Sequence, residues 1–310
     1  MDFSSMLKPE GIVKGDTFGI IAPAGPVTPC ELEEGIGLIR GSGYSVVLAR
    51  NIFHSKAYLA GDDSARLQDL HEMFLDDRVK AIICARGGSG SMRLLDKIDY
   101  ELIQEKPKIF IGYSDITALL LSFYRRAGLV TFHGPVLREI CRNEGNNWES
   151  LQRVISDGRR IELELSGAHI ISPGKSTGCL LGGNLSLVCN MMGTPFLPSL
   201  DGKILFLEEK GEALYRIDRM LVQLTLSGVL DEVSGVLLGS FEKCGDPSDL
   251  REMFSEIFSA LGVPVLMGIP SGHGVENKTI PMGVKAELDT EKMLLTYMEA
   301  VTVPRKGIGS

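Results

Sequence analysis

The chain lacks any apolar segment long enough to cross a membrane. No uninterrupted apolar run reaches the roughly 18 residues that a spanning helix needs. The first nine residues, Met1 to Pro9, also lack the apolar core of a secretory signal peptide. We therefore expect a cytoplasmic protein without a membrane partner.

Positive charge is scarce as well. The chain has 32 lysines and arginines against 40 aspartates and glutamates, which gives a formal net charge of -8. Nucleic acids and anionic membranes are bound by basic surfaces, because their phosphates need neutralising cations. We therefore expect no nucleic-acid partner.

Closely spaced cysteine pairs are absent too. None of the cysteines forms a C-x-x-C motif, and they stand at Cys30, Cys84, Cys141, Cys179, Cys189 and Cys244. Structural zinc sites and redox motifs use such pairs. The pattern predicts buried free thiols in a reducing compartment, and neither a metal nor another cofactor.

What the first half does contain is a regular alternation of strand-like and helix-like segments. Strands are expected at residues 16–24, 44–48, 79–85 and 109–113. Helices are expected at 31–42 and 114–127, and another within 57–74 that opens at Asp62-Asp63-Ser64. Such alternation is typical of a parallel sheet covered by helices. Ligands of these sheets bind beyond the carboxyl ends of the strands.

The second half has a mixed pattern, and at 310 residues two domains are a reasonable expectation. Strands are expected at residues 204–207, 233–238, 279–288 and 293–297, and helices at 184–192, 215–226 and 250–261. The predicted fold is an N-terminal parallel-sheet α/β domain plus a C-terminal α+β domain, with the active site between them. We place the first domain at 1–147, a linker at 148–173 and the second domain at 174–310.

Ser114 stands at the corner between a predicted strand and a predicted helix. The strand Ile109 to Tyr113 is apolar, and the helix pattern continues from Ile116. A serine at such a corner can cap the helix by accepting a backbone N–H bond. It can also be a nucleophile exposed on a sharp turn, as in the G-x-S-x-G elbow. The pattern alone leaves both roles open.

A serine nucleophile needs a base, and the base is usually oriented by an acid. Five histidines are available, at His54, His71, His133, His169 and His273. His273 is the best candidate base, because it lies in a Gly- and Pro-rich loop where an imidazole is not needed for core packing. A loop histidine with a local hydrogen bond is the alternative. His133 is a candidate for a structural or supporting role.

The acid is expected at the end of a buried strand, where Glu208 and Glu209 follow an apolar run. The order Ser114, Glu208, His273 is the order of α/β-hydrolases. The alternative is that both glutamates simply begin a charged loop. The second glycine of the elbow is replaced by Ile116 and no H-G-G-G motif is present, so a standard α/β-hydrolase fits poorly.

An acyl-transfer site also needs backbone N–H donors for the developing oxyanion. The amide of Asp115 follows the nucleophile, and the loop Arg86 to Ser91 offers Gly87 and Gly88 for close approach to a ligand. This loop matches neither common phosphate-binding glycine motif. Arg86 is a candidate contact for a substrate carboxylate, with an internal salt bridge as the alternative.

Several segments, in this order and spacing, resemble the LD-carboxypeptidase family of serine peptidases, which also includes the microcin C self-immunity peptidases. They are Gly15-Asp16, Ile21-Ala22-Pro23-Ala24, Ala85-Arg86-Gly87-Gly88-Ser89-Gly90, Ile111-Gly112-Tyr113-Ser114-Asp115-Ile116-Thr117-Ala118-Leu119, His133-Gly134-Pro135, Leu181-Gly182-Gly183-Asn184-Leu185, Phe206-Leu207-Glu208-Glu209, Tyr215-Arg216-Ile217-Asp218-Arg219-Met220-Leu221, Gly272-His273-Gly274 and Ile280-Pro281-Met282-Gly283. Each segment is modestly specific, and the set is strongly specific.

The resemblance implies a catalytic triad of Ser114, Glu208 and His273. It also implies an oxyanion hole from Gly88 and the Asp115 amide, with Arg86 and Gly87 binding substrate. Two positions depart from the family pattern. Ser89 stands where the family commonly has an aromatic residue, and the usual Glu-Asp acid motif reads Glu208-Glu209 here.

The activity that the resemblance implies is removal of the terminal D-alanine from murein tetrapeptides, by cleavage of an L,D-amide bond. The family is metal-free, cytoplasmic and typically dimeric, so a peptide substrate and a homodimer are expected. Two alternatives remain open. One is the same mechanism acting on a peptidyl-nucleotide conjugate, which would be favoured by an aromatic stacking residue near the site; Trp148 is the only tryptophan. The other is a non-catalytic binding module.

Overall fold

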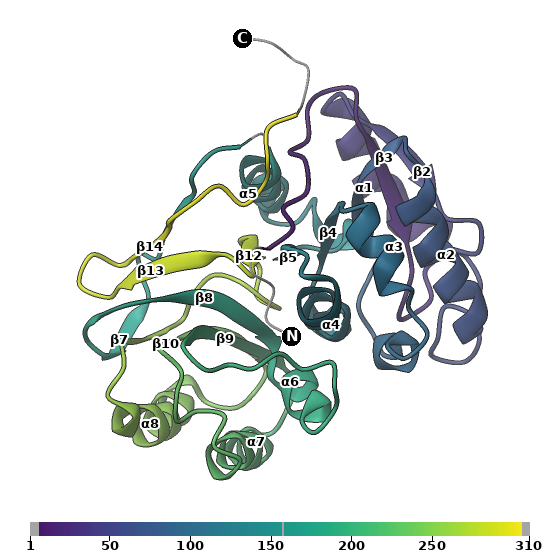
Figure 1. Ribbon diagram of the computed structural model, residues 1–310. Coiled ribbons are helices and arrows are strands. Elements are labelled where there is room, and N and C mark those ends of the chain that lie inside the picture. The colour runs from purple at the N-terminus through teal and green to yellow at the C-terminus, as the bar shows by residue number, and fades with distance from the viewer. Residues whose placement is uncertain (1–5, 157, 306–310) are drawn as a thin grey trace.

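Two β-sheets organise the chain into two lobes, and helices pack against both sheets (Figure 1). The computed structural model describes residues 6–156 and 158–305. The outermost residues of both predicted domains therefore lie outside the described residues, and so does part of the segment Met1 to Pro9 that was expected to lack a signal-peptide pattern. Within the described part, no helix has the length and apolar character needed to span a membrane.

The first sheet has six strands in the order β12-β5-β4-β3-β1-β2, and all its neighbours except β12 and β5 run parallel. Its strands are β1 (Thr17–Ile21), β2 (Ser45–Leu48), β3 (Val79–Cys84), β4 (Ile109–Gly112), β5 (Thr131–His133) and β12 (Ile280–Met282). Its helices are α1 (Pro29–Gly41), α2 (Asp63–Leu75), α3 (Tyr100–Glu105) and α4 (Thr117–Ala127). Strands β3 and β4 are almost completely buried, as continuous apolar runs in a parallel sheet should be.

The second sheet has eight strands in the order β6-β14-β13-β8-β9-β10-β11-β7. They are β6 (Glu162–Glu164), β7 (His169–Ser172), β8 (Lys175–Asn184), β9 (Lys203–Lys210), β10 (Gly235–Glu242), β11 (Val265–Met267), β13 (Lys285–Asp289) and β14 (Leu294–Tyr297). The central strands β8 to β11 are parallel, and antiparallel strands flank them. The sheet is therefore mixed, in keeping with the predicted α+β pattern.

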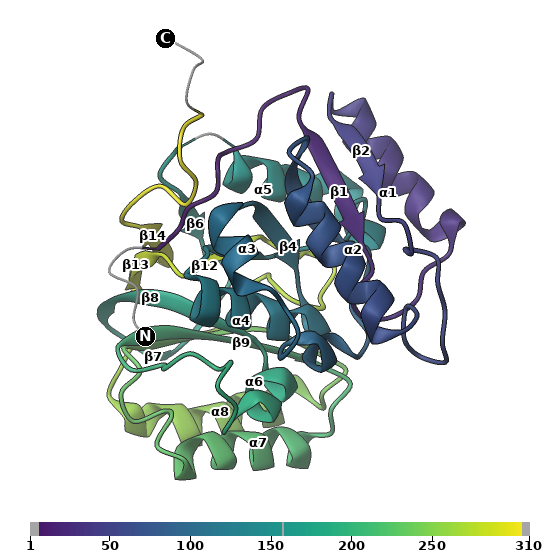
Figure 2. The ribbon, with the colours of Figure 1, turned by 45° about the vertical axis from the view of Figure 1, so that its right-hand side comes forward.

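Helices connect the parallel strands of the second sheet and cover one of its faces. They are α6 (Leu185–Met191), α7 (Leu214–Leu226) and α8 (Pro247–Phe258). Both views show α7 and α8 on the outer face, away from the first lobe (Figures 1 and 2). Helix α4 of the first lobe contacts both β8 and α6. The helix that follows Ser114 is thus packed directly against the second lobe.

One strand crosses between the lobes. The sequence predicts a single strand at residues 279–288, but the structure divides it at Gly283 into β12 and β13. β12 pairs with β5 in the first sheet, whereas β13 pairs with β8 and β14 in the second. Gly283 has φ +90°, and a Cβ there would lie 2.7 Å from Tyr124 Cδ2, so only glycine fits this break. The crossing carries the preceding loop, which contains His273, to the boundary between the lobes.

The segment 148–173, expected as a linker, is largely structured. It contains most of α5 (Asn146–Ile155) and the strands β6 and β7. β6 pairs with β14 and β7 pairs with β11, at the two edges of the second sheet. Both strands are short. β7 has no clear alternation of apolar residues, whereas apolar residues do alternate around β6, at residues 161–165, but over a short segment only. The domain limits themselves stay a prediction.

Candidate active site

Ser114 lies on a tight turn at the carboxyl end of β4. The strand ends at Gly112, a 3₁₀ turn spans Ser114–Ile116, and α4 begins at Thr117. Ser114 has φ +63°, a conformation that is unusual and strained for a residue with a side chain. A Cβ on Gly112 would lie 2.7 Å from Ile116 Cγ2. Ile116 can therefore occupy the position of the missing second glycine because Gly112 has no side chain.

The helix-cap interpretation of Ser114 is wrong. Neither the 3₁₀ turn nor α4 has a side-chain capping bond at its first residue. Asp115 does not cap the helix either, because its Oδ2 accepts a bond of 2.8 Å from the backbone N–H of Ser91. That bond ties the glycine-rich loop to the turn. The hydroxyl of Ser114 is thus not committed to holding the helix.

Glu208 and His273 are in direct contact. Glu208 lies near the end of β9 and is completely buried, and its Oε2 is 2.6 Å from Nδ1 of His273. The side chain of His273 is 11% exposed. A carboxylate on Nδ1 orients the imidazole and leaves Nε2 available on its other side. A Cβ on Gly272 would lie 2.6 Å from Glu208 Oε2, so the glycine beside His273 makes room for this contact.

Glu209 has a different environment, which separates the two adjacent glutamates. Its carboxylate accepts bonds from Asn184 Nδ2 at 2.9 Å, the Ser186 N–H at 2.8 Å and the Lys210 N–H at 2.8 Å. Glu209 therefore holds the first turn of α6. Only Glu208 reaches the imidazole, in agreement with the choice made from the sequence.

The loop that carries His273 is fixed by a hydrogen bond within itself and by bonds to two other elements, α5 and β10. The Gly272 N–H donates to Asn277 Oδ1 at 3.0 Å, and the Asn277 N–H donates to Asn147 Oδ1 at 2.9 Å. The Gly274 N–H donates to Ser240 Oγ at 3.0 Å. Asn147 on α5 and Ser240 on β10 carry no local sequence signal for this role, because their partners are over 30 residues away.

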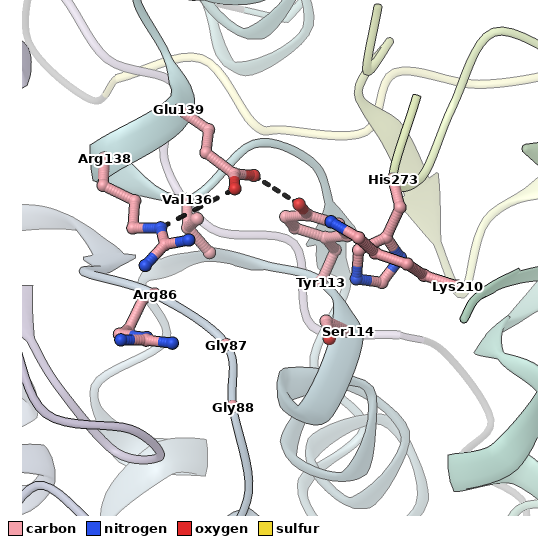
Figure 3. Close-up of a pocket in the computed structure, with 10 residues that line it drawn as sticks. All are labelled: Arg86, Gly87, Gly88, Tyr113, Ser114, Val136, Arg138, Glu139, Lys210 and His273. Atoms are coloured by element: carbon pink, nitrogen blue, oxygen red, sulfur yellow. Dashed lines mark hydrogen bonds and ion pairs between the residues drawn. The ribbon is translucent and has the colours of Figure 1, made fainter. Parts of the chain in front are cut away.

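Ser114 and His273 line the same cavity, although they come from different lobes. The cavity measures about 160 Å³, and Figure 3 shows its lining residues: Arg86, Gly87, Gly88, Tyr113, Ser114, Val136, Arg138, Glu139, Lys210 and His273. The cavity thus brings His273 together with the four residues that were expected at the site from the glycine-rich loop and the turn, which are Arg86, Gly87, Gly88 and Ser114. Glu208 lies behind the imidazole, and Asp115 follows Ser114 in the turn.

The glycine-rich loop approaches Ser114 closely. A Cβ on Gly87 would lie 3.1 Å from Ser114 Oγ. The carbonyl of Gly87 accepts a bond of 3.1 Å from the Gly25 N–H. In a trans peptide the C=O and the following N–H point in opposite directions. The N–H of Gly88 is therefore directed away from Gly25.

Two arginines line one side of the cavity. Arg86 Nη1 donates to the carbonyl of Pro26 at 3.1 Å, and within the described residues Arg86 forms no salt bridge. The internal salt bridge considered as an alternative for Arg86 is thus not found in that part of the chain. Arg138 lies 3.6 Å from a carboxylate oxygen of Glu31 and 3.7 Å from one of Glu139.

Tyr113 and Glu139 line the cavity and were not expected from the sequence. The Tyr113 ring lies 4.7 Å from the His273 ring, and its hydroxyl donates to Glu139. Burial, followed by the adjacent Glu139, raises the pKa of Tyr113 well above its usual range. The phenol therefore stays protonated and packs against the imidazole. In the sequence, only the position of Tyr113 directly before Ser114 indicates that its side chain lies at the site.

His133 is completely buried next to the site. Its ring lies 5.9 Å from Tyr113 and 4.9 Å from Phe206. Burial is the largest cause that lowers the pKa of His133 to about 3, followed by the nearby His273. A neutral, packed imidazole fits the structural role considered for it.

The cysteines are free, but they are not all buried. Cys30 is exposed, contrary to the expectation, while Cys84, Cys189 and Cys244 are buried. Burial raises the pKa of Cys189 to about 12 and that of Cys244 to about 11. Among the described residues, no group of three or more His, Cys, Asp or Glu side chains is arranged to hold a metal ion.

Comparison with known proteins identifies relatives along most of the chain. Residues 18–134 match the family model of the LD-carboxypeptidase N-terminal domain, and residues 177–288 match that of the LD-carboxypeptidase C-terminal domain. A Bacillus subtilis (strain 168) protein named probable murein peptide carboxypeptidase is 40% identical over 93% of this chain and 93% of its own length. The murein tetrapeptide carboxypeptidase of Pseudomonas aeruginosa is 34% identical over 88% of this chain and 93% of its own.

A solved structure has the same fold over nearly the whole chain. It is the structure of MccF in complex with glutamyl sulfamoyl guanosine, with a TM-score of 0.89 and 26% sequence identity. The match covers 96% of this chain and 99% of that one. The two-lobed arrangement is therefore shared with proteins of known structure.

Proposed function

This chain belongs to the LD-carboxypeptidase family, and we propose that it is a serine carboxypeptidase that releases the terminal D-alanine of murein tetrapeptides. The proposal rests on one observation above the others. A strained turn presents Ser114 to the cavity that His273 also lines, while Glu208 holds His273 from behind. Relatives named as murein peptide carboxypeptidases support the choice of substrate.

In the first step, Nε2 of His273 takes the proton of Ser114 Oγ while Oγ attacks the carbonyl that precedes the D-alanine. Glu208 accepts the Nδ1–H of His273 and stabilises the imidazolium that forms. The buried contact of 2.6 Å supports this role, because a buried carboxylate beside a cation is little screened by water. Tyr113 packs against the imidazole ring and limits its movement.

The negative oxygen of the tetrahedral intermediate is stabilised by the N–H groups of Gly88 and Asp115. The orientation of the Gly87–Gly88 peptide, which the Gly25 bond holds, supports the first donor. The position of Asp115 directly after the nucleophile, at the start of a helical turn, supports the second. Preorganised donors of this kind commonly contribute about 3 kcal/mol each to transition-state stabilisation.

The intermediate then collapses and the carbon–nitrogen bond breaks. His273 gives its proton to the leaving amine of D-alanine, and an acyl-enzyme ester remains on Ser114. Water, deprotonated by His273, hydrolyses that ester and returns the hydroxyl to Ser114. Every proton transfer in the cycle thus passes through one imidazole.

The small cavity suits a small leaving group with a carboxylate. A volume of about 160 Å³ is well below that of typical drug-sized pockets, which begin near 300 Å³. Arg86 and Arg138 supply the positive charge on the same side as the glycine loop. We assign the carboxylate of D-alanine to these arginines, because a guanidinium matches a carboxylate in two parallel bonds.

A peptidyl-nucleotide conjugate is the second candidate substrate, since the MccF structure holds glutamyl sulfamoyl guanosine. Trp148, the aromatic residue that could have stacked on a nucleotide base, does not support this second candidate. Trp148 is 3% exposed, its Nε1 donates to Ser42 Oγ at 2.8 Å, and its ring packs on Phe18 and Tyr44 in the core. A non-catalytic binding module would have no use for the strain at Ser114.

The test is incubation of the protein with a defined murein tetrapeptide and with an aminoacyl sulfamoyl nucleoside, followed by mass spectrometry. We expect a mass loss that corresponds to one alanine from the tetrapeptide and faster turnover of it than of the nucleoside. Preferential hydrolysis of the nucleoside would favour the second candidate. No turnover of either compound would favour the binding module.

Replacing Gly87 by alanine tests the close approach of the loop. The new Cβ would lie 3.0 Å from the Cβ and 3.1 Å from the Oγ of Ser114. We expect kcat/KM for D-alanine release to fall by roughly 10²-fold, the size of the loss of one oxyanion donor, with little change in Tm. The matched control is Gly37→Ala on α1, where nothing lies within 4 Å. Equal activity of the two variants would contradict the proposed geometry.

For assembly and location we propose a homodimer in the cytoplasm. Tyr215, Val222 and Leu226 on α7 are 58%, 41% and 83% exposed, and their spacing places them on one face of the helix. Apolar side chains grouped in this way favour contact with a second copy. A mass of one chain by light scattering would contradict the dimer. Six free thiols are compatible with a reducing compartment.

A further inference from the structure

Arg66 is a fully buried charge that the mechanism does not use. It lies on α2 with 1% of its surface exposed, and it is among the largest side chains that are almost completely buried. An arginine stays charged in a protein, and an ion removed from water costs free energy unless its partners compensate. The groups that Arg66 contacts therefore have to explain why a charge is kept at this position.

One nitrogen of Arg66 joins two loops. Nη1 donates to the carbonyl of Pro23, in the loop that follows β1, and to the carbonyl of Gly90 in the glycine-rich loop, at 3.0 Å. Nη2 donates to Oδ1 of Asp63, at the start of α2. Hydrogen bonds from Arg93 and then from Arg66 outweigh burial and lower the pKa of Asp63 to about 2. Asp63 is thus ionised at neutral pH and balances the charge of the guanidinium.

The two loops that Arg66 joins also meet next to Ser114. The Gly25 N–H donates to the Gly87 carbonyl at 3.1 Å, and this bond holds the peptide whose N–H belongs to Gly88. The loops are in contact there, because a Cβ on Gly88 would lie 3.0 Å from the N and Cα of Gly25. Figure 3 shows Gly87 and Gly88 beside Ser114. A change in the spacing of the two loops therefore moves the Gly88 N–H relative to Ser114.

The glycine-rich loop cannot fix this spacing by itself. Gly87, Gly88 and Gly90 have no side chains to pack, and glycine has more backbone freedom than any other residue. Gly88 and Gly90 have φ +127° and +118°. A Cβ on Gly90 would lie 3.0 Å from Arg66 Nη1, so the guanidinium occupies space that a side chain would take. The loop is thus positioned by contacts from outside it, and Arg66 provides the contact at its far end.

We propose that Arg66 is a positioning residue of the peptidase reaction, which sets the distance between the Gly88 N–H and Ser114 by holding Pro23 and Gly90 together. This inference rests on the proposed function. Arg66 does not line the cavity, so it acts through the two loops and not by contact with substrate. The oxyanion that Gly88 stabilises forms only after attack on the carbonyl. Loss of the positioning should therefore lower kcat and leave KM nearly unchanged.

Arg66→Lys is the variant that tests this role. Lysine keeps the positive charge beside Asp63, but its single nitrogen cannot reproduce the planar fork of the guanidinium. We expect kcat for D-alanine release to fall about 10-fold, which is part of the roughly 10²-fold loss of a whole oxyanion donor, with KM within about 2-fold. Steady-state kinetics on murein tetrapeptide measure both constants.

Arg93→Lys is the matched control, because it makes the same change in the other arginine that binds Asp63. The Arg93 side chain is 54% exposed, and its Nε and Nη2 donate to the Asp63 carboxylate at 2.9 Å each. We expect its kcat and KM to match those of the unmodified protein. Equal kcat values for Arg66→Lys and Arg93→Lys overturn the inference, and so does a rise in the KM of Arg66→Lys as large as the fall in its kcat.

Gly90→Ala tests the same joint if Arg66→Lys does not fold, as judged by circular dichroism. The new Cβ presses on Arg66 Nη1 from the loop side, while the charge of Arg66 and its contact with Asp63 remain. We expect the same fall in kcat with little change in KM. An unchanged kcat in folded Gly90→Ala overturns the inference.

Labelling of Ser114 by a fluorophosphonate separates failure of this inference from failure of the proposed function. Ser114 Oγ forms a bond to phosphorus, fluoride leaves with the bonding electron pair, and the hydroxyl proton passes to His273. The phosphonyl oxygen takes the place of the oxyanion, so the labelling rate should fall about 10-fold in Arg66→Lys and stay unchanged in Arg93→Lys.

Each combination of results decides between the two proposals. Normal D-alanine release with equal labelling rates in both variants overturns the positioning role and keeps the carboxypeptidase. No D-alanine release by the unmodified protein, together with slower labelling in Arg66→Lys alone, overturns the proposed function and keeps the positioning role. Absence of both release and labelling in the unmodified protein overturns both.

Discussion

Ser114→Ala is expected to lower kcat/KM for D-alanine release from murein tetrapeptide by about 10⁴-fold or more, a loss typical of a triad nucleophile. The physical reason is that no other hydroxyl among the cavity-lining residues, apart from the phenol of Tyr113, can attack the carbonyl. Burial and Glu139 keep that phenol protonated by raising its pKa. D-alanine release is measured by mass spectrometry or a coupled assay.

The stability of the Ser114 variants provides the control for this prediction. Ser114 has φ +63°, which a residue with a Cβ adopts at a cost of about 1 kcal/mol. Alanine keeps the Cβ, so the Tm of Ser114→Ala should match that of the unmodified protein. Ser114→Gly should be equally inactive and at least as stable as Ser114→Ala. Activity that survives in both variants would refute Ser114 as the nucleophile.

Glu208→Gln is expected to reduce kcat about 10⁴-fold, with a smaller effect on KM. Glutamine has nearly the shape of glutamate but no charge, and its amide cannot both accept the Nδ1–H and stabilise an imidazolium. The contact that it changes is the one of 2.6 Å between Glu208 Oε2 and His273 Nδ1. Steady-state kinetics on the tetrapeptide measure the effect.

Glu209→Gln is the matched control, since it makes the same chemical change one residue later. Its carboxylate accepts two hydrogen bonds at the start of α6 and one from the Lys210 N–H at the end of β9, and it does not touch His273. We expect Glu209→Gln to lose about 1–3 kcal/mol of unfolding free energy, with kcat reduced less than 10-fold. The reverse pattern, an inactive Glu209→Gln and an active Glu208→Gln, would show that the acid was assigned to the wrong glutamate.

Much of the fold was predictable because its signals are local. The strands at residues 79–85 and 109–113 are continuous apolar runs, and they form β3 and β4 at the centre of the first sheet. Helix α7 appears within one residue of its predicted start, because an amphipathic pattern is contained in the helix itself. The edge strands β6 and β7 escaped prediction because both are short, and β7 also lacks alternation.

The sequence by itself determined the chemical candidates: a serine on a strand-to-helix corner, a glutamate ending an apolar strand, and a histidine in a glycine-rich loop. These are properties of short segments, and short segments carry their own conformational preferences. Only the tertiary structure decided which candidates meet. The break at Gly283 sends β12 into the first sheet and β13 into the second, which brings the His273 loop to the boundary where Ser114 lies. Which of the two adjacent glutamates contacts the imidazole was likewise decided by the side of β9 that faces it, because successive side chains of a strand point to opposite faces.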